Sequence, residues 1–140
     1  MEKEALQAFL AKPNDAIVAV NRVGKGAQLT VVRFLWEDET FYFGTLKAYA
    51  KYLHMKRDPN ISLLVNDHEA HSYVAAYGIA KILEIGEAKP HIFQRLLEKY
   101  VPEERREQYS AARAAAQTSE RIVVELHPEK ILCFGGLVSA

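Results

Sequence analysis

The chain has 140 residues, a length that one domain with its own hydrophobic core can use in full. Its 18 basic and 18 acidic residues cancel, so no overall field attracts the chain to nucleic acid or acidic lipid. The single cysteine, Cys133, cannot form an internal disulfide, and no apolar run is long enough to cross a bilayer. We therefore expect one domain (1–140) of a cytoplasmic protein, with no nucleic-acid or membrane partner.

The first half of the chain predicts a short helix followed by a β-meander. Apolar residues at helical spacing predict a helix over residues 2–11, which Pro13 ends. Runs rich in β-branched and aromatic residues then predict three strands, over residues 16–20, 28–36 and 40–43. Gly24 and Gly26 mark a turn between the first two strands.

The second half predicts more strands with helices between some of them. A helix is expected over residues 46–56, followed by strands over 61–65 and 72–85, where Gly78 marks a bulge or a close backbone approach. Helices over 90–100 and 102–117 precede two closing strands, over 121–126 and 130–134. Because most strands follow one another directly, we predict a mainly β fold, an antiparallel barrel of six or seven strands with peripheral helices.

The segment FYFGTLKAYAKYLHMKRDPN (41–60) carries the main functional signal. Thr45 is placed to cap the N-terminus of the predicted helix. Lys47, Lys51 and His54 follow at spacings of four and three residues, which puts them on one helical face. Unpaired amides, a positive helix end and two ammonium groups suit a phosphate. The alternative is an ordinary solvated helix face.

Six stretches taken in order carry a family resemblance. They are Gly26 with QLTVVRFLW (28–36), FYFGT (41–45), Lys51, MKRDPNISLLV (55–65), YVAAYGIAKI (73–82) and RIVVELHPEKIL (121–132). Together they resemble the pyridoxamine 5′-phosphate oxidase-like split-barrel superfamily, whose members bind flavins or the related deazaflavin coenzyme. The likeness extends from residue 9 to about residue 132.

The resemblance implies a phosphate site at Thr45 and at Lys51, six residues later. Family members often have a second basic residue just before that lysine, where this chain has Tyr49 and Ala50. Lys47 or Arg33 is then expected to supply the missing charge. For Arg33 the alternative is a packed stem whose charged head reaches the sheet edge.

The cofactor ring is expected along the strand that begins at residue 28. There the resemblance implies contacts from the backbone amides of Thr30, Val31 and Val32, with Tyr49 flanking the ring. The alternative for the aromatic residues of these strands is a place in the core or at a subunit interface.

The function implied is that of a homodimeric oxidoreductase. FMN, or alternatively the deazaflavin coenzyme, would bind in a groove between subunits and pass hydride to a small-molecule acceptor. The tail ILCFGGLVSA lacks the basic and aromatic residues of true pyridoxamine phosphate oxidases, which argues against vitamin B6 chemistry. No side chain is assigned as a catalytic acid or base. The alternative is a non-catalytic carrier or sensor of the same fold that holds flavin or haem.

The sequence contains two weaker signals. His68 and His71 with Glu69 fall short of a tetrahedral metal set, so a polar turn is predicted there and no metal site. The basic helix also allows nucleic-acid binding, which the zero net charge disfavours.

Overall fold

The computed structural model describes residues 2–116 and 120–135. Seven strands form one antiparallel sheet in the order β2-β1-β5-β6-β7-β4-β3. The strands are β1 (Ala16–Val20), β2 (Gln28–Val32), β3 (Leu35–Glu37), β4 (Thr40–Leu46), β5 (Asn60–Asp67), β6 (Ser72–Glu84) and β7 (Arg121–Phe134). The sheet curls into a half-barrel, which confirms the predicted mainly β, split-barrel fold.

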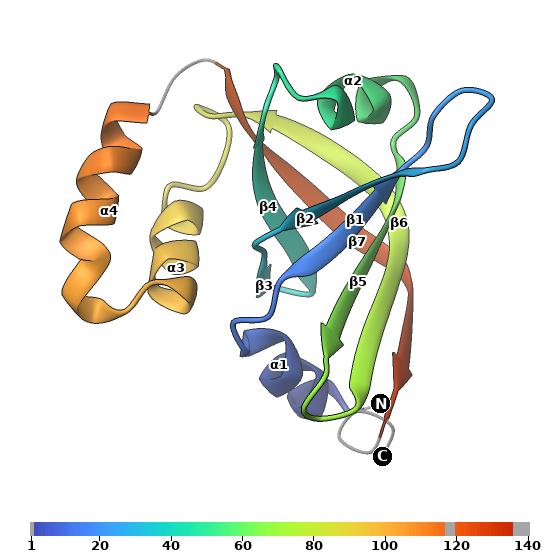
Figure 1. Ribbon diagram of the computed structural model, residues 1–140, viewed down its shortest axis with the longest axis horizontal. Helices are drawn as coiled ribbons and strands as arrows, with labels where there is room; N and C mark the ends of the chain where they lie inside the picture. Colours follow the sequence, from blue (N-terminus) through green and yellow to red (C-terminus); the bar gives the residue numbers. More distant parts are fainter. Residues whose placement is uncertain (1, 117–119, 136–140) are drawn as a thin grey trace.

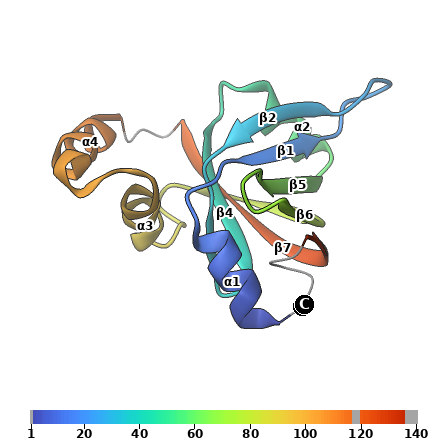
Figure 2. The same ribbon diagram turned by 60° about the horizontal axis from the view of Figure 1, so that its bottom comes forward.

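Four helices lie around the sheet: α1 (Lys3–Ala11), α2 (Ala50–Arg57), α3 (His91–Tyr100) and α4 (Glu103–Ala116). Figures 1 and 2 show α1 and α2 at opposite ends of the half-barrel, with α3 and α4 paired at its side. Within the described residues, no helix is both long and apolar enough to cross a membrane.

The core fills the inside of the curled sheet. Alternate residues of each strand point inward, as the burial pattern of β5 shows, and the inward set includes the fully buried Phe41 and Phe43 of β4. Leu10 of α1 and Met55 of α2 join this core. A second, smaller cluster lies on the outer face, where α3 packs Ile92 and its apolar neighbours against β4, β6 and β7.

Two strand predictions need correction. The predicted strand over residues 28–36 is two strands, because β2 pairs with β1 while β3 pairs with β4 at the other edge of the sheet. The chain crosses between the edges at Arg33 and Phe34. There two side chains of α3 form hydrogen bonds with the backbone of Phe34. The Phe34 amide donates to the Tyr100 hydroxyl (3.1 Å), and the Phe34 carbonyl accepts from the Lys99 ammonium (2.8 Å).

The two predicted closing strands are one continuous strand, β7. Pro128 does not end it because the ladder shifts register there: Tyr77 pairs with Lys130, and Gly78 pairs with Pro128. A Cβ on Gly78 would lie 2.7 Å from the carbonyl oxygen of His127, so only glycine fits. The bulge and the close backbone approach predicted at Gly78 are both confirmed.

The helix predicted over residues 46–56 begins later, at Ala50. β4 keeps its pairing with β7 as far as Leu46, which holds Thr45 in a strand, and Tyr49 takes the N-cap position without a side-chain bond. The predictions that Thr45 caps the helix and that Lys47 shares its face are therefore wrong.

Candidate cofactor site

The split in the barrel opens a cleft between the two edges of the sheet. β2 is an edge strand, and β3 covers only residues 40–42 of β4, so in the described chain residues 43–46 have a strand neighbour on one side alone. The cleft has a volume of about 310 Å3. It is lined by Val31, Val32, Arg33, Gly44, Thr45, Tyr49, Lys51, Phe93, Leu96, Leu97, Val101, Tyr109 and Arg121.

A second hollow, of about 450 Å3, adjoins the cleft. It is lined by Gln28, Thr30, Val31, Ala48, Tyr49, Ala50 and Lys51. Val31, Tyr49 and Lys51 border both spaces, so Lys51 stands between them. A ligand longer than either hollow can therefore lie across the Lys51 side chain.

Lys51 is the buried cation of this site. Its residue is only 7% exposed, and its ammonium donates to the Thr30 hydroxyl at 3.0 Å. Burial lowers the pKa of Lys51, since no carboxylate among the described residues lies within ion-pair distance to offset the lost hydration. An ammonium has three donors, so a buried one held by a neutral hydroxyl favours an anion nearby.

Thr45 contributes a second unsatisfied group. Its side chain is buried, and its hydroxyl oxygen has no hydrogen-bond partner in the part of the chain that the structure describes. Leaving such a group unpaired costs about 1–3 kcal/mol. The β4–β7 ladder holds Thr45 opposite Ile122, so its position is fixed by the sheet and does not depend on α2.

The other predicted residues divide into two groups. Arg33 lines the cleft, with its guanidinium carbon 5.2 Å from the centre of the Tyr100 ring, and Tyr49 lies half-exposed at the border of both hollows. Lys47 lines neither hollow, and its ammonium forms an ion pair with Glu84 at 2.9 Å. The hydrogen bond from Glu84 raises the pKa of Lys47. The structure thus brings together every predicted cofactor residue except Lys47.

Two parts of the cleft were not predicted. The first is the apolar wall that α3 supplies through Phe93, Leu96 and Leu97. Their helical spacing was recognisable, but it does not show which part of the sheet the helix covers. The second is Arg121 at the start of β7, which the sequence presents only as the first residue of a strand.

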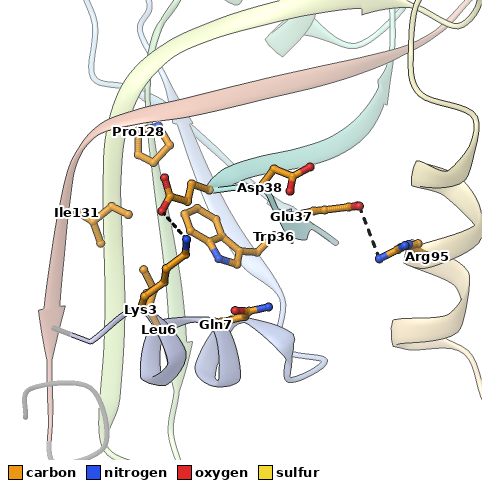
Figure 3. Close-up of a pocket in the computed structure, with 10 residues that line it drawn as sticks. Lys3, Leu6, Gln7, Trp36, Glu37, Asp38, Arg95, Pro128 and Ile131 are labelled. Atoms are coloured by element: carbon orange, nitrogen blue, oxygen red, sulfur yellow. Dashed lines mark ion pairs between the residues drawn. The ribbon is translucent and has the colours of Figure 1, made fainter.

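A larger hollow of about 720 Å3 lies elsewhere, between α1 and the turn that joins β3 to β4 (Figure 3). The Trp36 ring faces it, and its rim carries Glu37, Asp38 and Glu39. Glu39 pairs with Lys3 at 3.4 Å, and Glu37 pairs with Arg95 at 3.6 Å. Since these charges are already matched within the protein, this hollow attracts an ionic ligand less than the cleft does.

Two histidines lie close together in a turn of the sheet. His68 and His71 lie in the turn between β5 and β6, with ring centroids 6.1 Å apart. Across residues 2–116 and 120–135, no group of three or more His, Cys, Asp or Glu side chains is placed to hold a metal ion.

The curled seven-stranded sheet with its open side defines a split-barrel class of small β-proteins. The sequence profile described as pyridoxamine 5′-phosphate oxidase matches residues 2–133, nearly the whole chain. The chain therefore belongs to the pyridoxamine 5′-phosphate oxidase family. That family includes flavin- and deazaflavin-binding proteins. A comparison with curated protein sequences finds no match.

Solved structures share the fold at low sequence identity. A conserved hypothetical protein from Mycobacterium tuberculosis is 18% identical with a TM-score of 0.78, over 96% of this chain and 85% of that one. An F420 reductase is 16% identical with a TM-score of 0.68, over 90% and 94% of the two chains. General stress protein 26 from Bacillus anthracis is 18% identical with a TM-score of 0.69, over 94% and 92%.

Proposed function

We propose that residues 1–140 form a single cofactor-binding domain that acts as a flavin- or deazaflavin-dependent oxidoreductase. FMN or the deazaflavin coenzyme would bind in the cleft, with its phosphate held by Thr45 and Lys51. The observation that carries this proposal is the buried Lys51 ammonium beside the unpartnered Thr45 hydroxyl. A phosphate accepts hydrogen bonds from both groups and neutralises the buried charge.

The remaining walls suit a flat ring system. β2 is an edge strand, so alternate backbone groups along Thr30, Val31 and Val32 face away from β1, and α3 lines the cleft with the apolar side chains of Phe93 and Leu96. Such a cofactor supplies two-electron or hydride chemistry. This chain would bind the phosphate, orient the ring and exclude water from it, and we assign none of its side chains as a catalytic acid or base.

We also propose that two copies pair through the outer face of the sheet. One row of side chains crosses five strands by direct register, in the order Val31, Ile17, Leu64, Ala75 and Leu132. Val31 is 67% exposed, Ile17 40% and Leu132 46%, an apolar row that a partner would bury. Val31 belongs to this row and also lines the cleft, so a second copy seated here would border the cofactor site.

A titration tests the cofactor site. The protein is freed of any bound cofactor and titrated with FMN and with the deazaflavin coenzyme, and ligand fluorescence is followed. Replacement of Lys51 by alanine should weaken binding of the preferred coenzyme by about 1.5–3 kcal/mol. Lys56→Ala, on the exposed side of the same helix, is the matched control. Equal coenzyme affinities of the wild type and Lys51→Ala would refute the proposal that Lys51 binds the cofactor phosphate.

A turnover assay separates the enzyme from the carrier or sensor. The bound cofactor is reduced, and its reoxidation is followed with candidate small-molecule acceptors and with oxygen alone. Faster reoxidation by an acceptor supports the oxidoreductase, whereas reoxidation at the oxygen rate by every acceptor supports the carrier.

A further inference from the structure

Arg121 of β7 lines the same cleft as Lys51 of α2. It is the first residue of β7 and pairs with Leu46 at the end of β4. Its guanidinium extends back along β4, because one terminal nitrogen lies 3.4 Å from the position that a Cβ on Gly44 would occupy. The absence of a side chain at Gly44 leaves room for the Arg121 head.

The surroundings of the Arg121 guanidinium are aromatic and apolar. The guanidinium carbon of Arg121 lies 5.3 Å from the centre of the Phe93 ring on α3. Leu96 and Leu97 of the same helix line the cleft beside it. Charge interactions are stronger under such a cover than in open water.

One donor of Arg121 is left without a partner. The Nε nitrogen is buried and has no hydrogen-bond acceptor among residues 2–116 and 120–135. Among the buried side-chain atoms in that condition, Thr45 Oγ1 belongs to the same cleft. Two unsatisfied groups from neighbouring strands therefore line the space that Lys51 also borders, and one oxyanion between them would satisfy both.

We propose that Arg121 is a second oxyanion-binding residue of the cleft, and that the cleft takes a ligand bearing a phosphate or carboxylate group beneath α3. The planar guanidinium fork grips such groups in a two-point fashion that a lysine cannot reproduce. Arg121 thus supplies the second cation of the site, the position assigned from sequence to Lys47 or Arg33. This inference rests on the proposed cofactor site, although its first test does not need a cofactor.

The first test uses inorganic phosphate as the probe. Binding of phosphate to the cofactor-free protein is measured by calorimetry for the wild type, Arg121→Met and Arg121→Lys. Arg121→Met keeps the apolar stem and should weaken binding by roughly 10- to 100-fold, with Arg121→Lys between the two. Arg95→Met, an exposed arginine of α3 that lies outside the cleft, should match the wild type. Thermal unfolding of each variant confirms that it is folded.

The second test identifies which molecule brings the oxyanion. FMN and riboflavin, which lacks the phosphate, are titrated into the wild type and Arg121→Met. A loss confined to FMN assigns Arg121 to the cofactor's own phosphate. Unchanged affinities for both flavins, together with phosphate binding to the flavin-loaded wild type that Arg121→Met abolishes, assign it to a separate anionic substrate.

Different results would overturn the role of Arg121 and the proposed function. Equal phosphate and flavin affinities in the wild type and Arg121→Met would overturn the role of Arg121 and leave the Lys51 site standing. Failure of the wild type to bind either coenzyme would overturn the proposed function, while the phosphate titration would still decide the role of Arg121.

Discussion

The Lys51 ammonium donates a hydrogen bond of 3.0 Å to the Thr30 hydroxyl, and this contact joins α2 to the edge strand β2. Because Lys51 is buried, this bond serves both the packing of the helix and the charge of the cleft. Thr30 was predicted to contact the cofactor through its backbone, and its side chain also positions the lysine.

Replacing Thr30 by valine keeps the side-chain volume and removes the acceptor. The buried ammonium then loses the partner that the structure gives it, so we expect the free energy of unfolding to fall by about 1–3 kcal/mol. Urea denaturation measures this change. Thr30→Ser retains the hydroxyl and should stay close to the wild type; equal losses in both variants would show that the methyl group, and not the hydrogen bond, matters.

Lys99 makes the stability of the protein depend on pH. Its ammonium donates to the carbonyls of Leu10 and Phe34, both at 2.8 Å, and burial lowers its pKa from 10.5 to about 7. Between these values the unfolded chain holds a proton that the folded chain has released. The free energy of unfolding should therefore rise as the pH increases from about 7 toward 10, by an amount on the order of 2–4 kcal/mol.

Urea denaturation at several pH values tests this dependence. Lys99→Met should flatten the rise, whereas Lys56→Met, at an exposed position, should keep it. The pH series should end at pH 10. Burial raises the pKa of Tyr100 to about 12, so above pH 10 the ionisation of this tyrosine in the unfolded chain favours unfolding. The same slope in the wild type and Lys99→Met would contradict the prediction.

Gly78 leaves no room for a side chain between β6 and β7. An added methyl group would lie 2.7 Å from the His127 carbonyl oxygen, so Gly78→Ala must displace the backbone of β7 and should cost about 1–3 kcal/mol. Gly86→Ala is the control, since nothing lies within 4 Å of a Cβ there. Thermal unfolding compares the two, and a Gly78→Ala variant as stable as Gly86→Ala would argue against the close approach.

The apolar row on the outer face of the sheet predicts the oligomeric state. Leu132→Glu places a charge in the proposed interface, and we expect it to convert a dimer into a monomer in sedimentation velocity. Leu53→Glu changes another exposed leucine, on α2 and outside the row, and should remain dimeric. A wild-type protein that sediments as a monomer at all concentrations would refute the interface.

Local patterns predicted most of the sheet. β6 was expected over 72–85 and spans Ser72–Glu84, because a long apolar run with β-branched and aromatic residues favours a strand. Its alternating burial is not visible in the sequence, since the exposed face carries Tyr73, Tyr77 and Ile79. The break at Phe34 was not visible, since Arg33 and Phe34 continue a strand-forming composition. That break is caused by distant partners, Lys99 and Tyr100, which bind the backbone that a neighbouring strand would otherwise pair.

The candidate site was predicted in part, for a similar reason. Thr45 was chosen as a helix cap, a role it does not have, whereas Lys51 was chosen from the helix face and the family resemblance. Both line the cleft because the end of β4 and the first turn of α2 meet there. Their role toward a cofactor stays a prediction. Lys47 was misplaced because β4 continues to Leu46 and residues 47–49 form a turn, so that α2 begins only at Ala50. Arg121 was missed because the room for its guanidinium depends on the missing side chain at Gly44.

The bonds from α3 to Phe34 make the helical segment between β6 and β7 part of the barrel's own architecture. A shortened chain that joined β6 to β7 by a tight turn would lose both partners of the Phe34 peptide, together with the Tyr100 bond to the Asn14 carbonyl at 2.8 Å. A protein of this fold with a short connection between β6 and β7 needs other partners for the backbone between β2 and β3. Removing this segment to make a minimal scaffold would therefore break the hydrogen bonds that hold the chain between β2 and β3, the two edges of the sheet that border the cleft.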